Sequence, residues 1–253
     1  MKNFIKFIGF ILSIPFVFIA LLFNLLSAKI KAKKYIKSPQ DVLLADRQKL
    51  VYKIFKKFIY LSHIKVDANG LDKIPSKQLF YIANHKGTCD PLIIYVLLYD
   101  NNKLGAISFI AKAELKHKWY SKWVGILCDT IFLQRDNGRS ILDCYNKQIQ
   151  NIKNGFSIAV FPEGTRVSRD VFLEFKSTTL KPAFENFLTI IPIVIYGTDT
   201  KVRKKKRFSP YCVKIEVLKP IQPTEFITMK QQTLMPIIKK TIVDKYFELK
   251  EGK

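Results

Sequence analysis

The sequence has few cysteines, few histidines and few acidic residues. Its four cysteines, Cys89, Cys128, Cys144 and Cys212, lie far apart and form no CxxC pair and no cluster with histidine. This spacing predicts neither a disulfide framework nor a zinc site, and it is typical of a reducing compartment. We expect no metal and no cofactor. Because the chain has only three histidines, few side chains can transfer a proton near neutral pH.

The shortage of acidic residues gives the chain a large positive charge. Against 20 Asp and Glu stand 43 Lys and Arg, a formal net charge of +23, and 48% of the 253 residues are hydrophobic. That hydrophobic content excludes disorder, and the length suits one domain with an appendage. The charge calls for an anionic partner, either nucleic acid or a membrane surface. Since the aromatic residues follow core periodicity and no nucleic-acid-binding motif is found, we expect no nucleic-acid partner.

The first forty residues favour the membrane. Phe7–Leu26 contains no charged residue, and a helix of 20 residues spans roughly 30 Å, the thickness of the bilayer core. A cleaved signal peptide is a poor alternative because Ala28 and its neighbours form no good cleavage site. The lysines of Lys29–Lys37 predict that the bulk of the chain, which follows them, faces the cytoplasm. Pro15 leaves open whether this segment spans the bilayer or dips into one leaflet.

A second basic segment follows. Asp41–His63 carries paired apolar residues at helical spacing with lysines between them, which predicts a helix that lies either in the headgroup region or against the domain. We therefore divide the chain into membrane-anchoring helices at 1–63 and a second domain at 64–253, the one that carries the motifs described below. The run Lys201–Arg207 is either a solvated loop or a further contact with anionic lipid.

Beyond residue 70, short β-branched runs alternate with helical patterns, which predicts an α/β fold with a sheet covered by helices. The expected strands are Gln78–Ala83, Ile107–Ala111, Thr130–Leu133, Ser157–Phe161, Ile190–Tyr196 and Val213–Leu218. The expected helices are Pro91–Tyr99, Leu115–Ile126, Arg139–Lys153, stopped by Asn154-Gly155, and Gln231–Leu249.

Two polar segments follow predicted strands. The first, NHKGTCDP, contains His85 and Asp90, which can meet only if a turn joins the strand end to the next helix. A histidine oriented by a carboxylate can take a proton from a hydroxyl. Asp90 followed by Pro91 also predicts a helix N-cap, a purely structural role. The second segment, FPEGTR, offers Arg166 as a planar donor for phosphate and Gly164 for close backbone approach.

These segments resemble motifs of the glycerolipid acyltransferase family, in particular its lysophosphatidic acid acyltransferase branch. Asn84, His85 and Asp90 match an NHxxxxD block, and the FPEGTR block is complete. TIFLQRDN places Arg135 after an apolar strand, although Gln134 stands where an acidic residue is usual, and IIPIVIYG matches a proline-containing strand. Lys112 lies in a stretch like the family's lysine-containing one. A departure occurs in Phe175-Lys176-Ser177-Thr178, where the family commonly has Phe-Lys-x-Gly and this chain has Thr178 in place of the glycine.

The resemblance implies a mixed α/β sheet and acyl transfer from acyl-coenzyme A or acyl-carrier protein to a lysophospholipid hydroxyl. In this reaction we expect His85 to act as general base and Asp90 to orient it. A tetrahedral oxyanion also needs hydrogen-bond donors, and we expect backbone N–H groups after His85 to supply them. The residues expected to bind substrate are Lys112, Arg135, Glu163, Gly164, Thr165 and Arg166. Among these, Arg166 is expected to bind the acceptor phosphate, assisted by Lys112 and Arg135. Cys89 is expected to be a packing residue rather than a nucleophile. There are two alternatives. Within the family, the acceptor is another lysolipid or glycerol-3-phosphate; outside it, the chain is a basic membrane protein without enzymatic activity.

Overall fold

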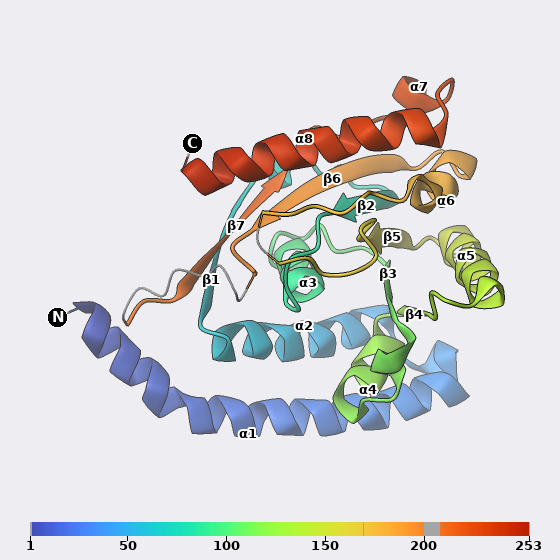
Figure 1. Cartoon of the computed structure of the whole chain (residues 1–253). Helices are drawn as coiled ribbons and strands as arrows, with labels where there is room; N and C mark the ends of the chain where they lie inside the picture. The colour runs from blue at the N-terminus through green and yellow to red at the C-terminus, as the bar shows by residue number, and fades with distance from the viewer. Residues whose placement is uncertain (1, 169, 200–207, 253) are drawn as a thin grey trace.

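A seven-stranded sheet with helices on both faces forms the centre of the molecule (Figure 1). This computed structural model describes residues 2–168, 170–199 and 208–252, so the basic run Lys201–Arg207 lies outside the described residues. The strands are β1 Ile64–Asn69, β2 Leu79–Ala83, β3 Ile107–Lys112, β4 Ile131–Leu133, β5 Ser157–Val160, β6 Thr189–Tyr196 and β7 Tyr211–Val217. Their order is β1-β7-β6-β2-β5-β3-β4, and only the β6–β7 pair is antiparallel. The sheet is therefore mixed, which confirms the predicted fold class.

Two hydrophobic clusters cover the two faces of this sheet. The described helices are α1 Lys2–Lys37, α2 Leu44–Leu61, α3 Asp90–Asp100, α4 Trp119–Leu127, α5 Gly138–Lys153, α6 Lys181–Glu185, α7 Pro223–Phe226 and α8 Gln231–Glu251. Helices α1 to α4 contribute to one cluster and α5 to α8 to the other. Successive side chains of a strand point to opposite faces; on β2, Tyr81 accordingly joins the first cluster and Ile82 the second. Both faces of the central strands are thus buried, as parallel sheets require.

The sequence predicts most of these elements. Each of the six expected strands overlaps an observed one, with bounds that differ by at most two residues. Strand β1 is missed because it lies at the sheet edge and only alternate side chains are shielded from solvent. The helix expected at Leu115–Ile126 is instead a short 3-10 helix at Ala113–Lys116 followed by α4.

The apolar segment at the N-terminus forms one long helix that runs along the body of the protein. Helix α1 is long and apolar enough to cross a membrane; it contains Pro15 and bends in its N-terminal part (Figure 1). Its buried side chains, Leu21, Leu25, Ala28 and Ala32, belong to the same core cluster as residues of α2 and α4. Small alanine side chains let α1 approach its neighbours closely. The opposite face of α1 consists largely of exposed apolar side chains.

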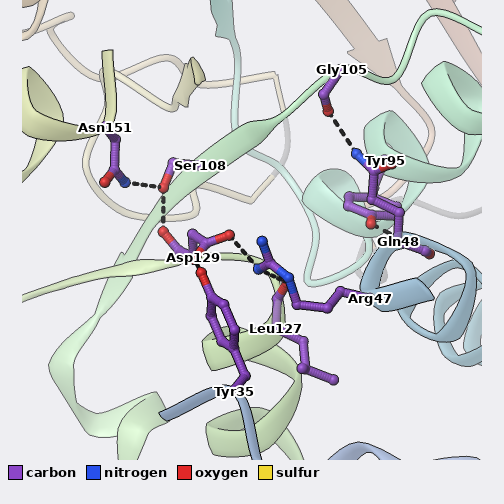
Figure 2. A network of polar contacts seen from close by, with 9 residues as sticks. All are labelled: Tyr35, Arg47, Gln48, Tyr95, Gly105, Ser108, Leu127, Asp129 and Asn151. Carbon is purple, nitrogen blue, oxygen red and sulfur yellow. Dashed lines mark hydrogen bonds and ion pairs between the residues drawn. The ribbon is translucent and has the colours of Figure 1, made fainter. Parts of the chain in front are cut away.

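A polar network ties α1 and α2 to the sheet (Figure 2). The carboxylate of Asp129, between α4 and β4, accepts hydrogen bonds from the Tyr35 hydroxyl and the Arg47 guanidinium, both at 2.6 Å. Arg47 is only 4% exposed and also donates to the Leu127 carbonyl at 3.0 Å. The Asp129 carbonyl in turn accepts from Ser108 on β3. A buried charge needs a partner, so this pair fixes where the N-terminal helices dock.

We expect Asp129→Asn to lower the free energy of unfolding by about 2 kcal/mol, because it leaves the buried Arg47 charge without its counterion. Asparagine tolerates the positive φ of 50° at this position, so the substitution tests charge rather than backbone strain. The measurement is chemical denaturation of the detergent-solubilised protein, followed by circular dichroism. Asp46→Asn is the control, since Asp46 pairs with Lys31 in solvent. Equal effects of the two substitutions would contradict the role given to Asp129.

Candidate active site

The residues singled out in the sequence gather at one edge of the sheet. Strands β6, β2, β5, β3 and β4 run parallel, so their carboxyl ends share this edge. His85 follows β2, Glu163 follows β5, Lys112 ends β3 and Arg135 follows β4. Open α/β sheets bind their ligands in this position.

Asn84 fixes the end of β2 to the neighbouring strand. Its side chain is fully buried, donates to the carbonyl of Ile195 and accepts from the N–H of Ile195, both at 2.8 Å. The amide thus continues the β2–β6 pairing beyond Ala83, where the backbone of β2 turns away. This contact sets the place from which the His85 turn begins.

His85 and Asp90 meet in that turn, as the sequence predicts. Nδ1 of His85 lies 2.8 Å from Oδ2 of Asp90, which also accepts from the backbone N–H groups of Lys86 at 2.7 Å and Gly87 at 2.8 Å. Because Nδ1 is engaged by the carboxylate, Nε2 is the ring nitrogen available to a substrate proton. The His85 ring stacks on Phe161, with ring centroids 4.4 Å apart.

The structure differs from the sequence prediction at two points of this turn. Asp90 is the first residue of α3 rather than its N-cap, which is Cys89; its carboxylate accepts from the preceding turn instead of from the helix. Backbone N–H groups after His85 are predicted to stabilise an oxyanion; the first two of them, those of Lys86 and Gly87, donate to Asp90 instead. Asp90 is completely buried, and these donors stabilise its charge.

The turn needs glycine at position 87 because another loop passes against it. A Cβ atom on Gly87 would lie 2.5 Å from the carbonyl oxygen of Thr198, which follows β6. No side chain fits in that distance. The segment after β6 therefore supports the turn from behind.

The loop after β5 holds the backbone of His85 on both sides. Oε1 of Glu163 accepts from the His85 N–H at 2.8 Å, and the N–H of Val167 donates to the His85 carbonyl at 3.2 Å. The second carboxylate oxygen accepts from Leu173 at 3.3 Å. Burial raises the pKa of the Glu163 carboxyl, and the N–H of His85 and the charge of Lys86 oppose that rise. The sequence predicts that Glu163 binds substrate; in the structure its carboxylate is buried and accepts from two backbone N–H groups.

One cationic side chain contacts the same turn, and two others lie near Gly164 in the loop after β5. The Arg166 side chain is exposed and donates to the Thr88 hydroxyl at 2.5 Å. A Cβ on Gly164, whose φ is +70°, would lie 3.9 Å from both the Arg135 guanidinium carbon and the Lys176 ammonium. Burial lowers the pKa of Arg135. These side chains suit a phosphate, which binds guanidinium and ammonium groups.

Thr165 and Lys112 complete the set of residues predicted to bind substrate, and Lys176 is a further cation that this prediction does not include. Thr165 and Lys112 are exposed, and Lys112 pairs in register with Leu133, two residues before Arg135. The sequence prediction gives Lys176 no role. Its place in the segment after FPEGTR is the signal that could identify it as a substrate-binding candidate. The other histidines lie elsewhere: His63 stacks on Phe10 of α1 at 4.2 Å, and His117 follows the 3-10 helix at Ala113–Lys116.

Comparison with known proteins places the chain in a family. The sequence profile of the Acyltransferase family matches residues 65–196. A probable 1-acyl-sn-glycerol-3-phosphate acyltransferase of Mycoplasma pneumoniae is 32% identical to this chain, over 96% of this chain and 93% of the relative. Another, of Mycoplasma genitalium, is 34% identical, over 93% of this chain and 91% of the relative. The crystal structure of the 1-acyl-sn-glycerophosphate acyltransferase PlsC from Thermotoga maritima superposes with a TM-score of 0.64, at 25% identity, over 92% of this chain and 98% of the other. The chain therefore belongs to the acyltransferase family, and it is an enzyme rather than the non-enzymatic basic membrane protein that its composition also allowed.

Proposed function

We propose that this enzyme transfers an acyl group from acyl-coenzyme A or acyl-carrier protein to the sn-2 hydroxyl of 1-acylglycerol-3-phosphate, giving phosphatidic acid for phospholipid synthesis. The observation that carries the proposal is the His85–Asp90 pair beside a cluster of cations. The relatives named for this reaction support the choice of acceptor.

His85 acts as the general base. Its Nε2 takes the proton from the acceptor hydroxyl as the oxygen attacks the thioester carbonyl, and Asp90 stabilises the imidazolium that forms. When the tetrahedral intermediate collapses, the carbon–sulfur bond breaks and the imidazolium returns its proton to the departing thiolate. The substrate hydroxyl is the nucleophile, so no acyl-enzyme forms. Cys89, half-buried and 4.0 Å from the Ser62 hydroxyl, is a packing residue.

The cationic residues bind the acceptor phosphate. The guanidinium of Arg166 contacts the His85 turn by its hydrogen bond to Thr88. It therefore lies near the acceptor when the hydroxyl of the acceptor is at His85. Arg135 and Lys176 border Gly164 in the same loop, and Lys112 lies on the adjoining strand end. Three or four positive groups around one phosphate give the charge-assisted bonds that such a site needs.

Helix α1 anchors the enzyme in one leaflet rather than spanning the bilayer. Both ends of α1 contact the body: the Phe4 ring lies 5.2 Å from the Phe208 ring, and Tyr35 bonds to Asp129. A spanning helix would have to leave the body for roughly 30 Å. We assign residues 1–63 to membrane association and residues 64–253 to catalysis, with the body on the cytoplasmic side, as the basic flank favours.

The proposed reaction is tested with purified enzyme in vesicles, radiolabelled thioester donors and three acceptors. We expect acyl transfer to 1-acylglycerol-3-phosphate in preference to glycerol-3-phosphate and lysophosphatidylcholine, with phosphatidic acid as the product seen by mass spectrometry. A preference for either other acceptor would overturn the proposed substrate. Separate reactions with acyl-coenzyme A and acyl-carrier protein identify the donor.

His85→Gln and Asp90→Asn should each lower kcat by about 10²–10⁴-fold, because each removes the proton-accepting pair. Both substitutions nearly preserve size, and flotation with vesicles should be unchanged. Full activity in the His85→Gln protein would exclude the general-base mechanism.

Arg166→Ala should raise the KM for 1-acylglycerol-3-phosphate about tenfold or more, since it removes a charge-assisted bond to phosphate. The KM for the donor should change little. Lys153→Ala, at the end of α5, is a control that removes a positive charge at the opposite edge of the sheet. An effect confined to the donor would move Arg166 to the donor site.

Spin labels at Phe16→Cys, Phe23→Cys and Ile30→Cys test how α1 lies. These exposed positions are seven residues apart, so they share a face. In a background without the native cysteines, we expect all three labels at one shallow depth in the leaflet. A spanning helix would instead separate the first and last labels by about 20 Å, which relaxation by oxygen and by an aqueous nickel complex resolves.

A further inference from the structure

A buried lysine follows the candidate catalytic histidine. Lys86 is only 4% exposed, and its ammonium donates to the carbonyl of Val171. The same ammonium lies 3.7 Å from the ring centre of Phe172 and 5.6 Å from that of Tyr246 on α8. Fully buried lysines are rare, because an ammonium loses its hydration on burial. The aromatic rings and the carbonyl replace that hydration.

Carboxylates on several segments act electrostatically on this charge. Burial lowers the pKa of Lys86, while Glu163, Asp170, Asp199 and Asp90 act in the opposite direction. These carboxylates come from the turn itself, from the loop after β5 and from the segment after β6. The charge of Lys86 is thus favoured by carboxylates from all of these segments.

The contacts of Lys86 reach the loop that carries Arg166. Between β5 and the 3-10 helix that begins at Ser177, the described residues form no helix or strand. The first part of this loop is bonded to His85, as described above. Its second part contains Val171 and Phe172 and is held from inside by Lys86. From outside, Lys250 at the end of α8 bonds to Asp170 at 2.6 Å.

We propose that Lys86 is a positioning residue that clamps the loop after β5 onto the catalytic turn and so sets the place of Arg166 relative to His85. The proposal rests on the function proposed above. Lys86 precedes Gly87 in the turn, so one short segment supplies the base and also holds the loop that binds the acceptor phosphate. Small displacements of a binding group lower catalytic efficiency strongly.

The kinetic test compares Lys86→Met, which keeps the length of the side chain without its charge, with Lys86→Arg, which can still donate to Val171. We expect Lys86→Met to raise the KM for 1-acylglycerol-3-phosphate about tenfold, with a donor KM within about threefold of wild type. Lys86→Arg should recover most of the acceptor affinity. Lys103→Met is the matched control, since Lys103 also donates to a carbonyl, that of Ile74, at 2.9 Å, and its kinetics should be unchanged.

An unchanged acceptor KM in Lys86→Met would overturn the proposal. So would a fall in kcat accompanied by equal rises in the KM values of acceptor and donor, if Lys86→Arg did not reverse them. If Lys86→Met does not fold, Lys250→Ala tests the same loop from its exposed side. It should raise the acceptor KM about threefold, and no change would overturn the proposal. Inactive wild-type enzyme would instead refute the proposed function itself.

Limited trypsin digestion reads the loop directly, without substrate. Cleavage after Arg166 should be several-fold faster in Lys86→Met than in wild type, because loosened segments open more often. Cleavage after the exposed Lys118, before α4, provides the internal reference and should keep its rate. Equal rates after Arg166 in both proteins would show that Lys86 does not hold the loop.

Discussion

One buried carboxylate oxygen organises the candidate active site. Oδ2 of Asp90 accepts from the His85 ring and from two successive backbone N–H groups, so the same contacts that stabilise the charge also close the turn. Several neighbours support that turn: Asn84 bonds the end of β2 to β6, Thr198 packs against Gly87, and Glu163 and Val167 bond to the backbone of His85. The geometry of His85 is therefore determined mainly by hydrogen bonds to backbone, which bind in fixed directions.

The electrostatics divide into two classes. Most of the 43 basic residues lie on the surface, where single ion pairs contribute little to stability. Arg47 and Lys86 are different: each is buried and faces carboxylates from distant segments. Arg47 joins the N-terminal helices to the sheet, and Lys86 lies between the catalytic turn and the loop after β5. These two buried cations therefore link parts of the chain that the hydrophobic core alone would leave free to slide.

The sequence predicts local features well and long-range contacts poorly. The strands and most helices follow from hydrophobic periodicity, and the meeting of His85 with Asp90 follows from a glycine-containing turn between two elements. The role of Glu163 could not be predicted, because its partner His85 is 78 residues away. The prediction that Asp90 is an N-cap is wrong for a related reason. A carboxylate at the start of a helix can accept from N–H groups of the helix or from those of the preceding turn, and the fold of the turn determines which.

The docking of α1 along the body has a consequence for how the enzyme meets its substrates. If α1 lies in the leaflet as we propose, the network around Asp129 holds the catalytic turn at a constant height above the lipid. Acceptor molecules then arrive by lateral diffusion, and the turnover rate follows their mole fraction in the leaflet rather than their concentration in the bulk solution. Under the reaction proposed above, the product returns to the leaflet from which the acceptor came, and one side of the bilayer would be enriched in phosphatidic acid.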